Sequence, residues 1–543
     1  MKRSLRNGGN LMIIEGQLYG RSVKMFAERP SNVYEMLVDS AKKFPTKEAL
    51  IKDDVRLNYT ELKKQVDIVA DNLIQKQVKK GDRIALLLGN EIEFVLTVLA
   101  CAKIGAVFVP LNTKLTANEL IYMITNSGAK ILITDSRLVK PLEDWLINSK
   151  FIPYCYLIDD HQPLKNMYSF KNELLKEPLE SEPVYTAPLE TEALYIMYTS
   201  GTTGLPKGAV GSHINAIHSC LSYKYVLNTD HHVRTLIAVP LFHVTGLIGQ
   251  LLHVILVGGT TVLMDRYRTE PFIRLINAEK ITFLFNVPTI YIMMMSHPLF
   301  KSFSYDFVQI VAYGGAPMSK ETIKELKTYF PNASMHNAYG ATETTSPTTI
   351  MPKNYPVEKT SSVGLPVPVA DLKIVNDHGA DCGPAEIGEL YIKGPMVIKE
   401  YWNNKEANLA SFSEDGYWKS GDIAYIDQDG FVYIMDRKKD VINRGGEKIY
   451  SVEIENILYA HPKILEAAVV GVKDPLFGEE VKAYIVKKPG EELTEEEVIA
   501  FARKYLSEFK VPKQVEFIEE LPRNPGGKIL KNKLIEMSMT NKS

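Results

Sequence analysis

The chain has 543 residues, of which 45% are hydrophobic and 24% charged, and its 63 Lys plus Arg and 65 Asp plus Glu give a formal net charge of -2. Near-neutral charge argues against a protein that coats nucleic acid or binds membranes through a polybasic surface, because both need a strong positive field. At roughly 150 residues per domain, the length predicts three or four folding units. A chain of this size buries a large core without disulfide or metal crosslinks.

The cysteine spacing is typical of a protein from a reducing compartment, and the apolar segments are too short for a signal peptide or a membrane span. The four cysteines stand far apart in the sequence, at Cys101, Cys155, Cys220 and Cys382. They form no C-x-x-C pair, so neither a disulfide framework nor a zinc cage is predicted. No apolar signal segment follows the basic residues 1–10, and the longest apolar run, 248–257, is far shorter than the roughly 20 residues that span a bilayer. We expect a cytoplasmic protein with no integral membrane segment.

The first 180 residues alternate between helical and strand patterns. The expected elements are a helix from Thr60 to Leu73, a strand at 84–88, a helix at 91–105, a strand at 106–109, a helix at 117–125 and a strand at 131–134. The helices show apolar residues at 3.6-residue spacing, and the strands are short apolar runs. Alternation at this spacing predicts a mostly parallel sheet covered by helices on both faces.

The remaining chain divides into three further segments. A Pro-containing polar linker at 171–192 leads into a second α/β stretch at about 193–350. Short strands separated by Gly-rich turns follow, at 372–375, 388–392 and 431–435, and predict a small antiparallel or barrel-like unit. The tail has its own α+β pattern, with a capping box formed by Thr494 and Glu497. We therefore predict an α/β protein with a large N-terminal domain, made of two α/β subdomains and a small β-barrel-like subdomain, and a small α+β C-terminal domain.

The most informative segment is the glycine-rich stretch at 198–208, YTSGTTGLPKG. Its candidate phosphate-binding residues are Thr199, Ser200, Gly201, Thr202, Thr203, Gly204 and Lys207. Glycines let backbone N–H groups approach an anion, hydroxyls donate further hydrogen bonds, and lysine adds a positive charge. The spacing differs from that of a P-loop, G-x-x-x-x-G-K-[ST]. A flexible surface loop is the alternative, but the apolar run at 193–197 reads as a buried strand and favours phosphate binding.

Further motifs follow in a fixed order along the chain. They are PLFH at 240–243, YGGAP at 313–317, NAYGATE at 337–343, GELYIKG at 388–394, YWKSGD at 417–422, DRKKD at 436–440, GGEK at 445–448 and NPGGKI at 524–529. Together with the glycine-rich loop they resemble the signature motifs of the adenylate-forming superfamily, which includes acyl-CoA synthetases, firefly luciferase and peptide-synthetase adenylation domains. The resemblance covers nearly the whole chain.

This resemblance implies a two-step reaction with ATP, Mg²⁺ and coenzyme A. A carboxylate attacks the α-phosphorus of ATP, which releases pyrophosphate and leaves an acyl-AMP. A thiol then attacks the acyl carbon, and AMP leaves. Both steps need positive charge and hydrogen-bond donors around phosphate oxygens.

The resemblance also assigns roles to single residues of the large domain. The loop from Thr199 to Lys207 would hold the β- and γ-phosphates, Thr342 the α-phosphate, and Glu343 the Mg²⁺ ion, which prefers carboxylate oxygen. The adenine and ribose would lie among Gly315, Ala316, Pro317, Asn337, Tyr339, Gly340, Asp422 and Arg437. Read without the resemblance, Glu343 is a helix-starting acid, Tyr339 a core aromatic and Asp422 a turn residue.

Two domains that move relative to each other follow from the same resemblance. The body would span 1–436 and a mobile C-terminal domain 437–543, with a hinge near 437–440 at Lys439. Lys528 would bridge the carboxylate and the α-phosphate during adenylation. After rotation, Gly446 would border the pantetheine tunnel, where a side chain would obstruct the thiol. His243 would act as a gate to the acyl pocket; the alternative is a hydrogen-bonded structural histidine.

The acid pocket is expected from segments 243–247, 286–289, 314–316 and 342–349, which carry little fixed charge. We predict a medium- or long-chain fatty acid, for which the glycines would leave space, while an aryl acid also fits. Free coenzyme A is the expected acceptor. A carrier-protein thiol, a luciferase-like oxygenase and a non-catalytic nucleotide-binding homologue remain alternatives, and a homodimer stays open. His231 and His232 read as surface residues without further ligands at metal spacing.

Overall fold

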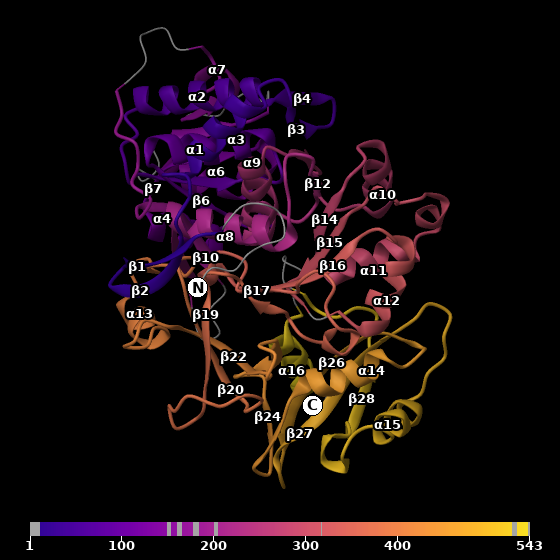
Figure 1. Ribbon diagram of the computed structural model, residues 1–543. Coiled ribbons are helices and arrows are strands. Elements are labelled where there is room, and N and C mark those ends of the chain that lie inside the picture. The colour runs from indigo at the N-terminus through magenta and orange to yellow at the C-terminus, as the bar shows by residue number, and fades with distance from the viewer. Residues whose placement is uncertain are drawn as a thin grey trace.

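The computed structural model describes residues 11–148, 154–159, 166–177, 184–199, 205–316, 318–523 and 529–540 (Figure 1). Its helices and strands form a large body of two α/β sheets and one antiparallel sheet, and a small C-terminal unit. The predicted mixed α/β class, with a large N-terminal and a small C-terminal domain, is confirmed. Among the described residues, no helix is both long and apolar enough to cross a membrane.

The first large sheet is eight-stranded and mostly parallel. Its strands, in spatial order, are β21 (Glu400–Tyr401), β11 (Lys207–Ser212), β10 (Ala193–Thr199), β6 (Val107–Pro110), β5 (Arg83–Leu87), β7 (Ala129–Thr134), β8 (Tyr154–Leu157) and β9 (Met167–Ser169). Only β10–β11 and β11–β21 pair antiparallel. The helices predicted between its strands are α2 (Tyr59–Gln75), α3 (Ile92–Ile104) and α4 (Ala117–Ser127). Asn58, and not Thr60, caps α2, because its side chain accepts from Glu61 N.

The second large sheet is nine-stranded and draws on distant parts of the chain. Its strands, in spatial order, are β18 (Leu365–Pro366), β17 (Thr349–Ile350), β16 (Ser334–Tyr339), β15 (Ile310–Gly314), β14 (Phe283–Asn286), β12 (Arg234–Ile237), β13 (Thr260–Leu263), β3 (Glu48–Lys52) and β4 (Val55–Asn58). The hairpin β3–β4 comes from the N-terminal segment, while β10 and β11 belong to the first sheet. The two α/β subdomains therefore exchange strands and do not divide cleanly at the polar linker.

Helices of the second sheet supply part of the core and of the site. They are α8 (His213–Leu227), α9 (His253–Val257), α10 (Thr269–Ala278), α11 (Pro288–Ser296) and α12 (Lys320–Tyr329). A π-helical segment, η2 (Thr245–Leu252), joins α9 directly. One continuous apolar core joins α2, α3 and α8 to the strands β12 to β16.

The small β unit expected after residue 352 is a four-stranded antiparallel sheet. Its strands are β19 (Asp371–Val375), β20 (Gly388–Lys393), β22 (Trp418–Ile426) and β23 (Val432–Arg437). β23 includes Arg437, so the strand reaches one residue past the expected domain boundary before the turn at 438–440.

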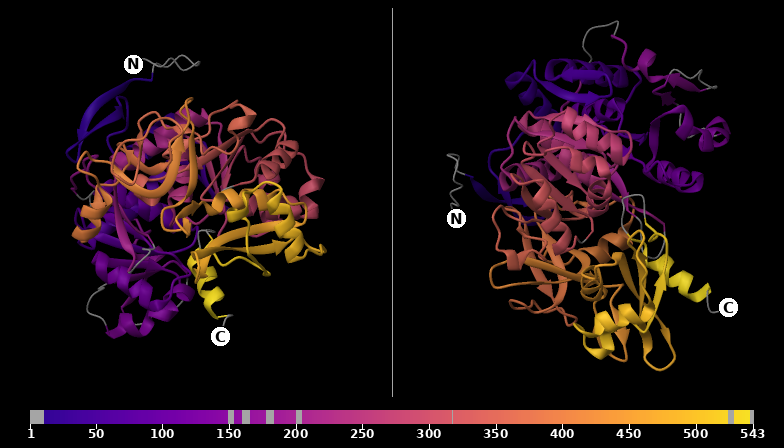
Figure 2. Two further views of the ribbon diagram at one scale, coloured as in Figure 1. Left: turned by 90° about the horizontal axis from the view of Figure 1, so that it is seen from below. Right: turned by 90° about the vertical axis from the view of Figure 1, so that its right-hand side faces the viewer.

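The C-terminal unit has its own sheet and its own apolar core. Its strands and helices are β24 (Ile442–Arg444), β25 (Glu447–Ile449), α14 (Ser451–Tyr459), β26 (Ile464–Asp474), β27 (Gly478–Lys487), α15 (Glu495–Arg503), β28 (Gln514–Phe517) and α16 (Lys531–Thr540). The predicted capping box of Thr494 and Glu497 is present at the start of α15. Figures 1 and 2 show this unit, coloured orange to yellow, packed at one end of the body.

Candidate active site

Several candidate residues stand at the carboxyl ends of strands in the two large sheets. Thr199 ends β10, Gly314 ends β15 and Tyr339 ends β16. Ligands of open α/β sheets bind at this edge, because loops and helix starts converge there. The motifs that lie far apart in the sequence therefore approach one another in the fold.

Asp422 is the meeting point of the residues expected to bind the nucleoside. It is paired with Arg437 across β22 and β23, and the Arg437 Nε lies 2.8 Å from Asp422 Oδ1. The Tyr339 hydroxyl donates to Asp422 Oδ2. Burial raises the pKa of Tyr339 well above its ordinary value, and the neighbouring Asp422 carboxylate raises it further. A buried carboxylate at this position suits recognition of vicinal hydroxyls, because it can accept two hydrogen bonds.

Glu343 is a buried carboxylate in a one-turn 3₁₀ helix, η4 (Thr342–Thr344), with 9% of its surface exposed. The Tyr401 hydroxyl donates to its Oε1 at 2.9 Å, and the Thr199 hydroxyl lies 3.5 Å from the same oxygen. Burial raises the pKa of Glu343 above its ordinary value. Within the described part of the chain, no basic side chain forms an ion pair with it, so the carboxylate fits a cation ligand.

The two ends of the glycine-rich loop are fixed by the sheet. Thr199 and Lys207 are register partners of the antiparallel strands β10 and β11. The Lys207 ammonium lies 5.7 Å from the centre of the Tyr401 ring. The remaining candidates in the loop lie outside the described residues; they are Ser200, Gly201, Thr202, Thr203 and Gly204.

The expected adenine segment is only partly described. Gly315 has a positive φ of 79°, and Ala316 follows it, whereas Pro317 lies outside the described residues. Asn337 is the register partner of Tyr313 in β16 and β15, and its Nδ2 donates to Ser362 O at 3.2 Å. Gly340 packs closely, because a Cβ there would lie 1.4 Å from Ser346 O.

A strained turn after Glu343 is held by two buried tyrosines. Thr345 and Ser346 both have positive φ values, 50° and 93°. Such conformations are costly for residues with a side chain and persist when their surroundings enforce them. The Tyr195 hydroxyl donates to Thr345 Oγ1 at 3.0 Å, and the Tyr223 hydroxyl lies 2.8 Å from Ser346 Oγ. These contacts fix the backbone immediately after the carboxylate.

His243 is not a fully hydrogen-bonded structural histidine. His243 lies two residues before η2. Its Nε2 atom is buried and has no hydrogen-bond partner among the described residues. Burial lowers the pKa of His243 to about 4, so the imidazole is neutral at pH 7. A neutral ring with a free nitrogen is compatible with the gate predicted from the sequence, and with contact to a bound acid.

Two of the three glycines in the segments of the expected acid pocket make close contacts. A Cβ at Gly246 would lie 2.8 Å from Pro240 O, and a Cβ at Gly314 would lie 2.4 Å from Ala338 O, whereas a Cβ at Gly315 would make only an ordinary contact with Val287 at 3.6 Å. The sequence predicts that glycines in this region leave space for a long chain, but Gly246 and Gly314 instead let backbone segments approach closely. The neighbouring Asn286 amide is fully buried, and neither of its polar atoms has a hydrogen-bond partner among the described residues.

The candidates of the C-terminal unit lie in turns. Lys439 is exposed in the turn at 438–440, and Gly446 has a positive φ of 96° in the turn between β24 and β25. Within the described part of the chain, no atom lies within 4 Å of a Cβ built at Gly446, so the backbone conformation, and not close packing, accounts for glycine there. Lys528 lies outside the described residues.

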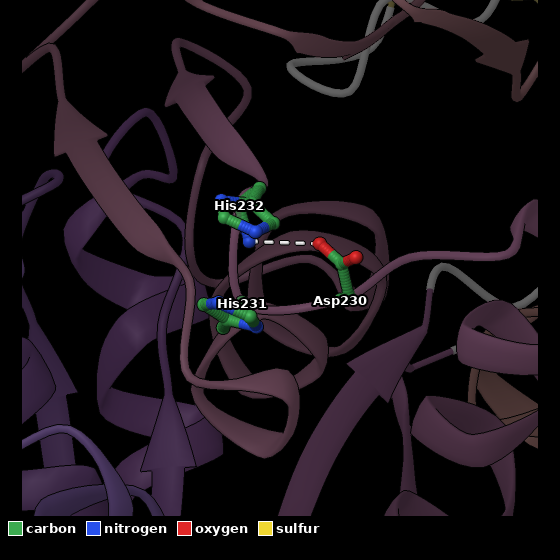
Figure 3. Close-up of side chains that lie close together, drawn as sticks. All are labelled: Asp230, His231 and His232. Atoms are coloured by element: carbon green, nitrogen blue, oxygen red, sulfur yellow. Dashed lines mark hydrogen bonds between the residues drawn. The ribbon is translucent and has the colours of Figure 1, made fainter.

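Asp230, His231 and His232 form a small group on the loop before β12 (Figure 3). Their potential ligand atoms all lie within 4.8 Å of one another, so Asp230 is a third group beside the two histidines. Asp230 Oδ1 already accepts from His232 N, and the His231 ring is stacked on Phe44 at 4.7 Å. These contacts are those of a capped surface turn.

Sequence reasoning missed several residues that support the site. They are Tyr195, Tyr223, Tyr401 and Trp418, all buried. Tyr195, Tyr223 and Tyr401 belong to none of the motifs, and Trp418 lies in the motif at 417–422 but was given no role of its own. The signal for Tyr401 is weak: it is part of an aromatic pair with Trp402 between two motifs, and its partner Glu343 lies 58 residues away.

Comparisons with known proteins agree with this geometry. A family model of AMP-binding enzymes matches residues 37–402, and a model of the C-terminal domain of AMP-binding enzymes matches residues 453–528. The chain is 36% identical to a 2-succinylbenzoate–CoA ligase of Bacillus licheniformis, over 92% of this chain and 98% of that protein. It is 32% identical to a long-chain-fatty-acid–CoA ligase of Bacillus subtilis, over 93% and 94% of the two chains.

Solved structures show the same fold. The o-succinylbenzoate-CoA synthetase of Bacillus subtilis, in complex with its acyl-adenylate intermediate, superimposes with a TM-score of 0.80 at 32% identity, over 93% of this chain and 98% of that chain. The same enzyme has been solved in complex with ATP and a magnesium ion, again with a TM-score of 0.80 and 32% identity, over 92% and 98% of the two chains.

Proposed function

Because the chain belongs to the AMP-binding enzyme family, and within it to the acyl-CoA synthetase type, it is an acid–thiol ligase of the AMP-forming kind, and we propose that it joins a carboxylic acid without an ammonium group to coenzyme A. The carboxylate attacks the α-phosphorus of ATP, and pyrophosphate leaves. The thiol of coenzyme A then attacks the acyl carbon of the acyl-AMP, and AMP leaves.

The observation that carries this proposal is the presence of two buried carboxylates, Asp422 in β22 and Glu343 in η4, whose surroundings differ. Asp422 is positioned by Tyr339 and Arg437, which suits a ribose, and Glu343 has hydroxyl donors but no basic partner among the described residues, which suits a cation. Magnesium, when bound, would neutralise triphosphate charge. Lys207, at the base of the glycine-rich loop, adds the positive charge that a triphosphate needs.

The other candidate residues have defined roles under this proposal. Thr342 hydrogen-bonds the α-phosphate, and the loop from Thr199 to Lys207 holds the β- and γ-phosphates. Lys528 neutralises the charge that develops between carboxylate and α-phosphate. The C-terminal unit rotates about the turn at 438–440 between the two half-reactions, and Gly446 then borders the thiol path.

A medium- or long-chain fatty acid is the first proposed substrate class, and the similarity to a long-chain-fatty-acid–CoA ligase supports it. An aryl acid is the second candidate. The close packing at Gly246 and Gly314 favours a compact acid, and so does the similarity to 2-succinylbenzoate–CoA ligases. Both classes lack the ammonium group that an amino-acid pocket would have to neutralise.

Pyrophosphate release tests the proposal and separates the two substrate classes. The full chain would be incubated with ATP, Mg²⁺, coenzyme A and short, medium, long and aromatic acids in turn. We expect acid-dependent release with one class, and loss of at least tenfold of that activity in Asp422→Asn, which keeps the shape but not the charge. A holo-carrier protein in place of coenzyme A tests the carrier alternative. Absence of acid-dependent release across the panel would contradict the proposal.

A further inference from the structure

Tyr401 connects two parts of the site that are distant in the sequence. It lies in the short strand β21, which pairs with β11 through Tyr401 and Ala209, and only 4% of its surface is exposed. Its hydroxyl lies 2.9 Å from Glu343 Oε1. Its ring centre lies 5.7 Å from the Lys207 ammonium. One side chain therefore contacts both the candidate metal ligand and the candidate phosphate-binding lysine.

The direction of the hydrogen bond to Glu343 follows from a third residue. The Trp418 Nε1 lies 3.3 Å from the Tyr401 oxygen. An indole N–H can only donate, so the Tyr401 oxygen accepts from Trp418. The proton of the Tyr401 hydroxyl is then directed to Glu343, whose ionised carboxylate can only accept. Trp418, Tyr401 and Glu343 form a chain in which each donor has a fixed direction.

The hydroxyl groups around Glu343 contact only one of its two carboxylate oxygens in the described part of the chain. The hydroxyls of Tyr401 and Thr199 both contact Oε1. Among the described residues, no other side chain donates to Oε2, which leaves it as the oxygen available for a cation. A hydrogen bond to one carboxylate oxygen also fixes the rotation of the group, so the second oxygen has a defined direction.

The Tyr401 ring acts on Lys207 in a different way. An ammonium within about 6 Å of an aromatic centre is attracted by the negative face of the ring. Lys207 is further located by the pairing of β11 with β10 and with β21. The lysine stem therefore starts from a fixed point of the same sheet that carries Tyr401.

From these contacts we propose that Tyr401 is a positioning residue that sets Glu343 Oε2 and the Lys207 ammonium at a fixed separation for a metal–triphosphate complex. The inference rests on the proposed function, because it presumes that Glu343 ligates the metal of a bound nucleotide. Under this proposal Tyr401 acts through these two residues and not by direct contact with the nucleotide or the metal. Its hydroxyl acts on the metal ligand, and its ring acts on the lysine.

Binding of Mn²⁺, used as a spectroscopic substitute for Mg²⁺, tests this assignment without any acid substrate. The full chain with saturating ATP would be titrated with Mn²⁺ and followed by electron paramagnetic resonance. In Tyr401→Phe, which keeps the ring, we expect Mn²⁺ affinity to fall roughly tenfold, while metal-free ATP affinity stays within twofold. In Tyr401→Leu, both affinities should fall. Tyr425→Phe is the matched control, because Tyr425 lies in β22 and stacks on Tyr433.

Trp418→Phe provides a second route to the same answer. It leaves the Tyr401 hydroxyl in place but removes the donor that orients it, so we expect a two- to threefold loss of Mn²⁺ affinity. If thermal unfolding shows that Tyr401→Phe does not fold, Trp418→Phe still tests the positioning role of Tyr401. If the wild-type chain binds no Mn²⁺ with ATP, the proposed function fails. If the wild type binds and both variants bind equally well, only the role of Tyr401 is overturned.

Discussion

The body and the C-terminal unit differ in the contacts that hold their candidate site residues in place. In the body, Glu343 and Asp422 are both buried, and each is contacted by side chains from other elements. Between body and C-terminal unit, the ion pairs Lys448–Asp377 and Lys438–Glu389 involve lysines that are more than half exposed. The body is therefore preorganised by its core, whereas these contacts of the C-terminal unit break at little cost, since exposed ion pairs contribute about 0–1 kcal/mol.

One buried contact also joins the two regions. Asp436, the last but one residue of β23, accepts from Ser451 N and Oγ at the start of α14. Lys531 in α16 reaches the same serine and forms an ion pair with Glu455 at 2.8 Å. This contact lies next to the proposed hinge, as does the pair Lys438–Glu389, whose lysine is part of the turn at 438–440. The body is thus held by buried contacts, whereas the boundary at which we propose the rotation is largely polar.

The largest effect is expected from Lys528→Ala, which tests whether the two regions act in different half-reactions. Adenylation should fall about 10²–10³-fold or more, because a preorganised positive charge is lost at the transition state. Thioester formation from preformed acyl-AMP should be largely spared. Each half-reaction would be measured separately, by ATP–pyrophosphate exchange and by release of AMP. Equal loss in both would remove this role for Lys528.

Acid should unfold the body before the C-terminal unit. Burial lowers the pKa of His213, His218, His253 and His336 to about 4, and all four lie in the body. The unfolded chain binds more protons than the folded chain between about pH 6.5 and 4, so stability falls as pH decreases through this window. The expected loss at pH 5 is about 2 kcal/mol for each histidine.

Tryptophan fluorescence during urea unfolding measures this loss in the body alone. All three tryptophans, Trp145, Trp402 and Trp418, precede the C-terminal unit. We expect the fluorescence midpoint to shift strongly between pH 7 and pH 5, and His378→Gln, an exposed histidine, to leave the shift unchanged. A body whose midpoint does not move would show that its histidines are not held neutral.

Gly211→Ala should destabilise the body by about 2 kcal/mol, because it overpacks the strand pair that supports the site. Gly211 is the register partner of Tyr195, and a Cβ there would lie 1.9 Å from Tyr195 Cζ. Tyr195 would be displaced from Thr345 and the turn after Glu343 would loosen. Urea unfolding measures the loss, with Gly383→Ala as control, since a Cβ at Gly383 would make only ordinary contacts. Equal stability of the two variants would contradict this packing account.

The smallest effect is expected from Asp377→Asn, which breaks an exposed contact of the C-terminal unit. Stability should change by less than about 1 kcal/mol. If release of the C-terminal unit limits turnover, the thioester half-reaction should accelerate by up to a few fold, while adenylation stays unchanged. Single-turnover measurements of both half-reactions distinguish these outcomes. A loss of adenylation as large as that of Lys528→Ala would show that the boundary is part of the catalytic site.

Regular elements and family motifs were predictable because their signals are local. The predicted strands at 84–88 and 106–109 correspond to β5 and β6, and the helix at 117–125 corresponds to α4. The motif residues were recognisable by their spacing. The fatty-acid preference rests on small apolar residues and glycines and stays a prediction, although Gly246 and Gly314 serve close packing and do not open space.

Long-range partners could not be predicted, because no local pattern specifies them. The hairpin β3–β4 joins the second sheet and not the first, through the pairing of β3 with β13, more than 200 residues later. Tyr195, Tyr223 and Tyr401 read as ordinary core aromatics until their hydroxyls are seen to contact residues near or at Glu343.

By itself, the sequence determined the family, the order of the elements and the types of side chain expected at the site, because motif spacing and apolar periodicity are local properties of the sequence. Only the tertiary structure decided which hydroxyl meets which carboxylate, and from which side. Those contacts depend on strand register and on the space that a glycine leaves for a ring, as at Gly211 and Tyr195. Register and close packing are properties of the assembled core, which sets them for all the strands together.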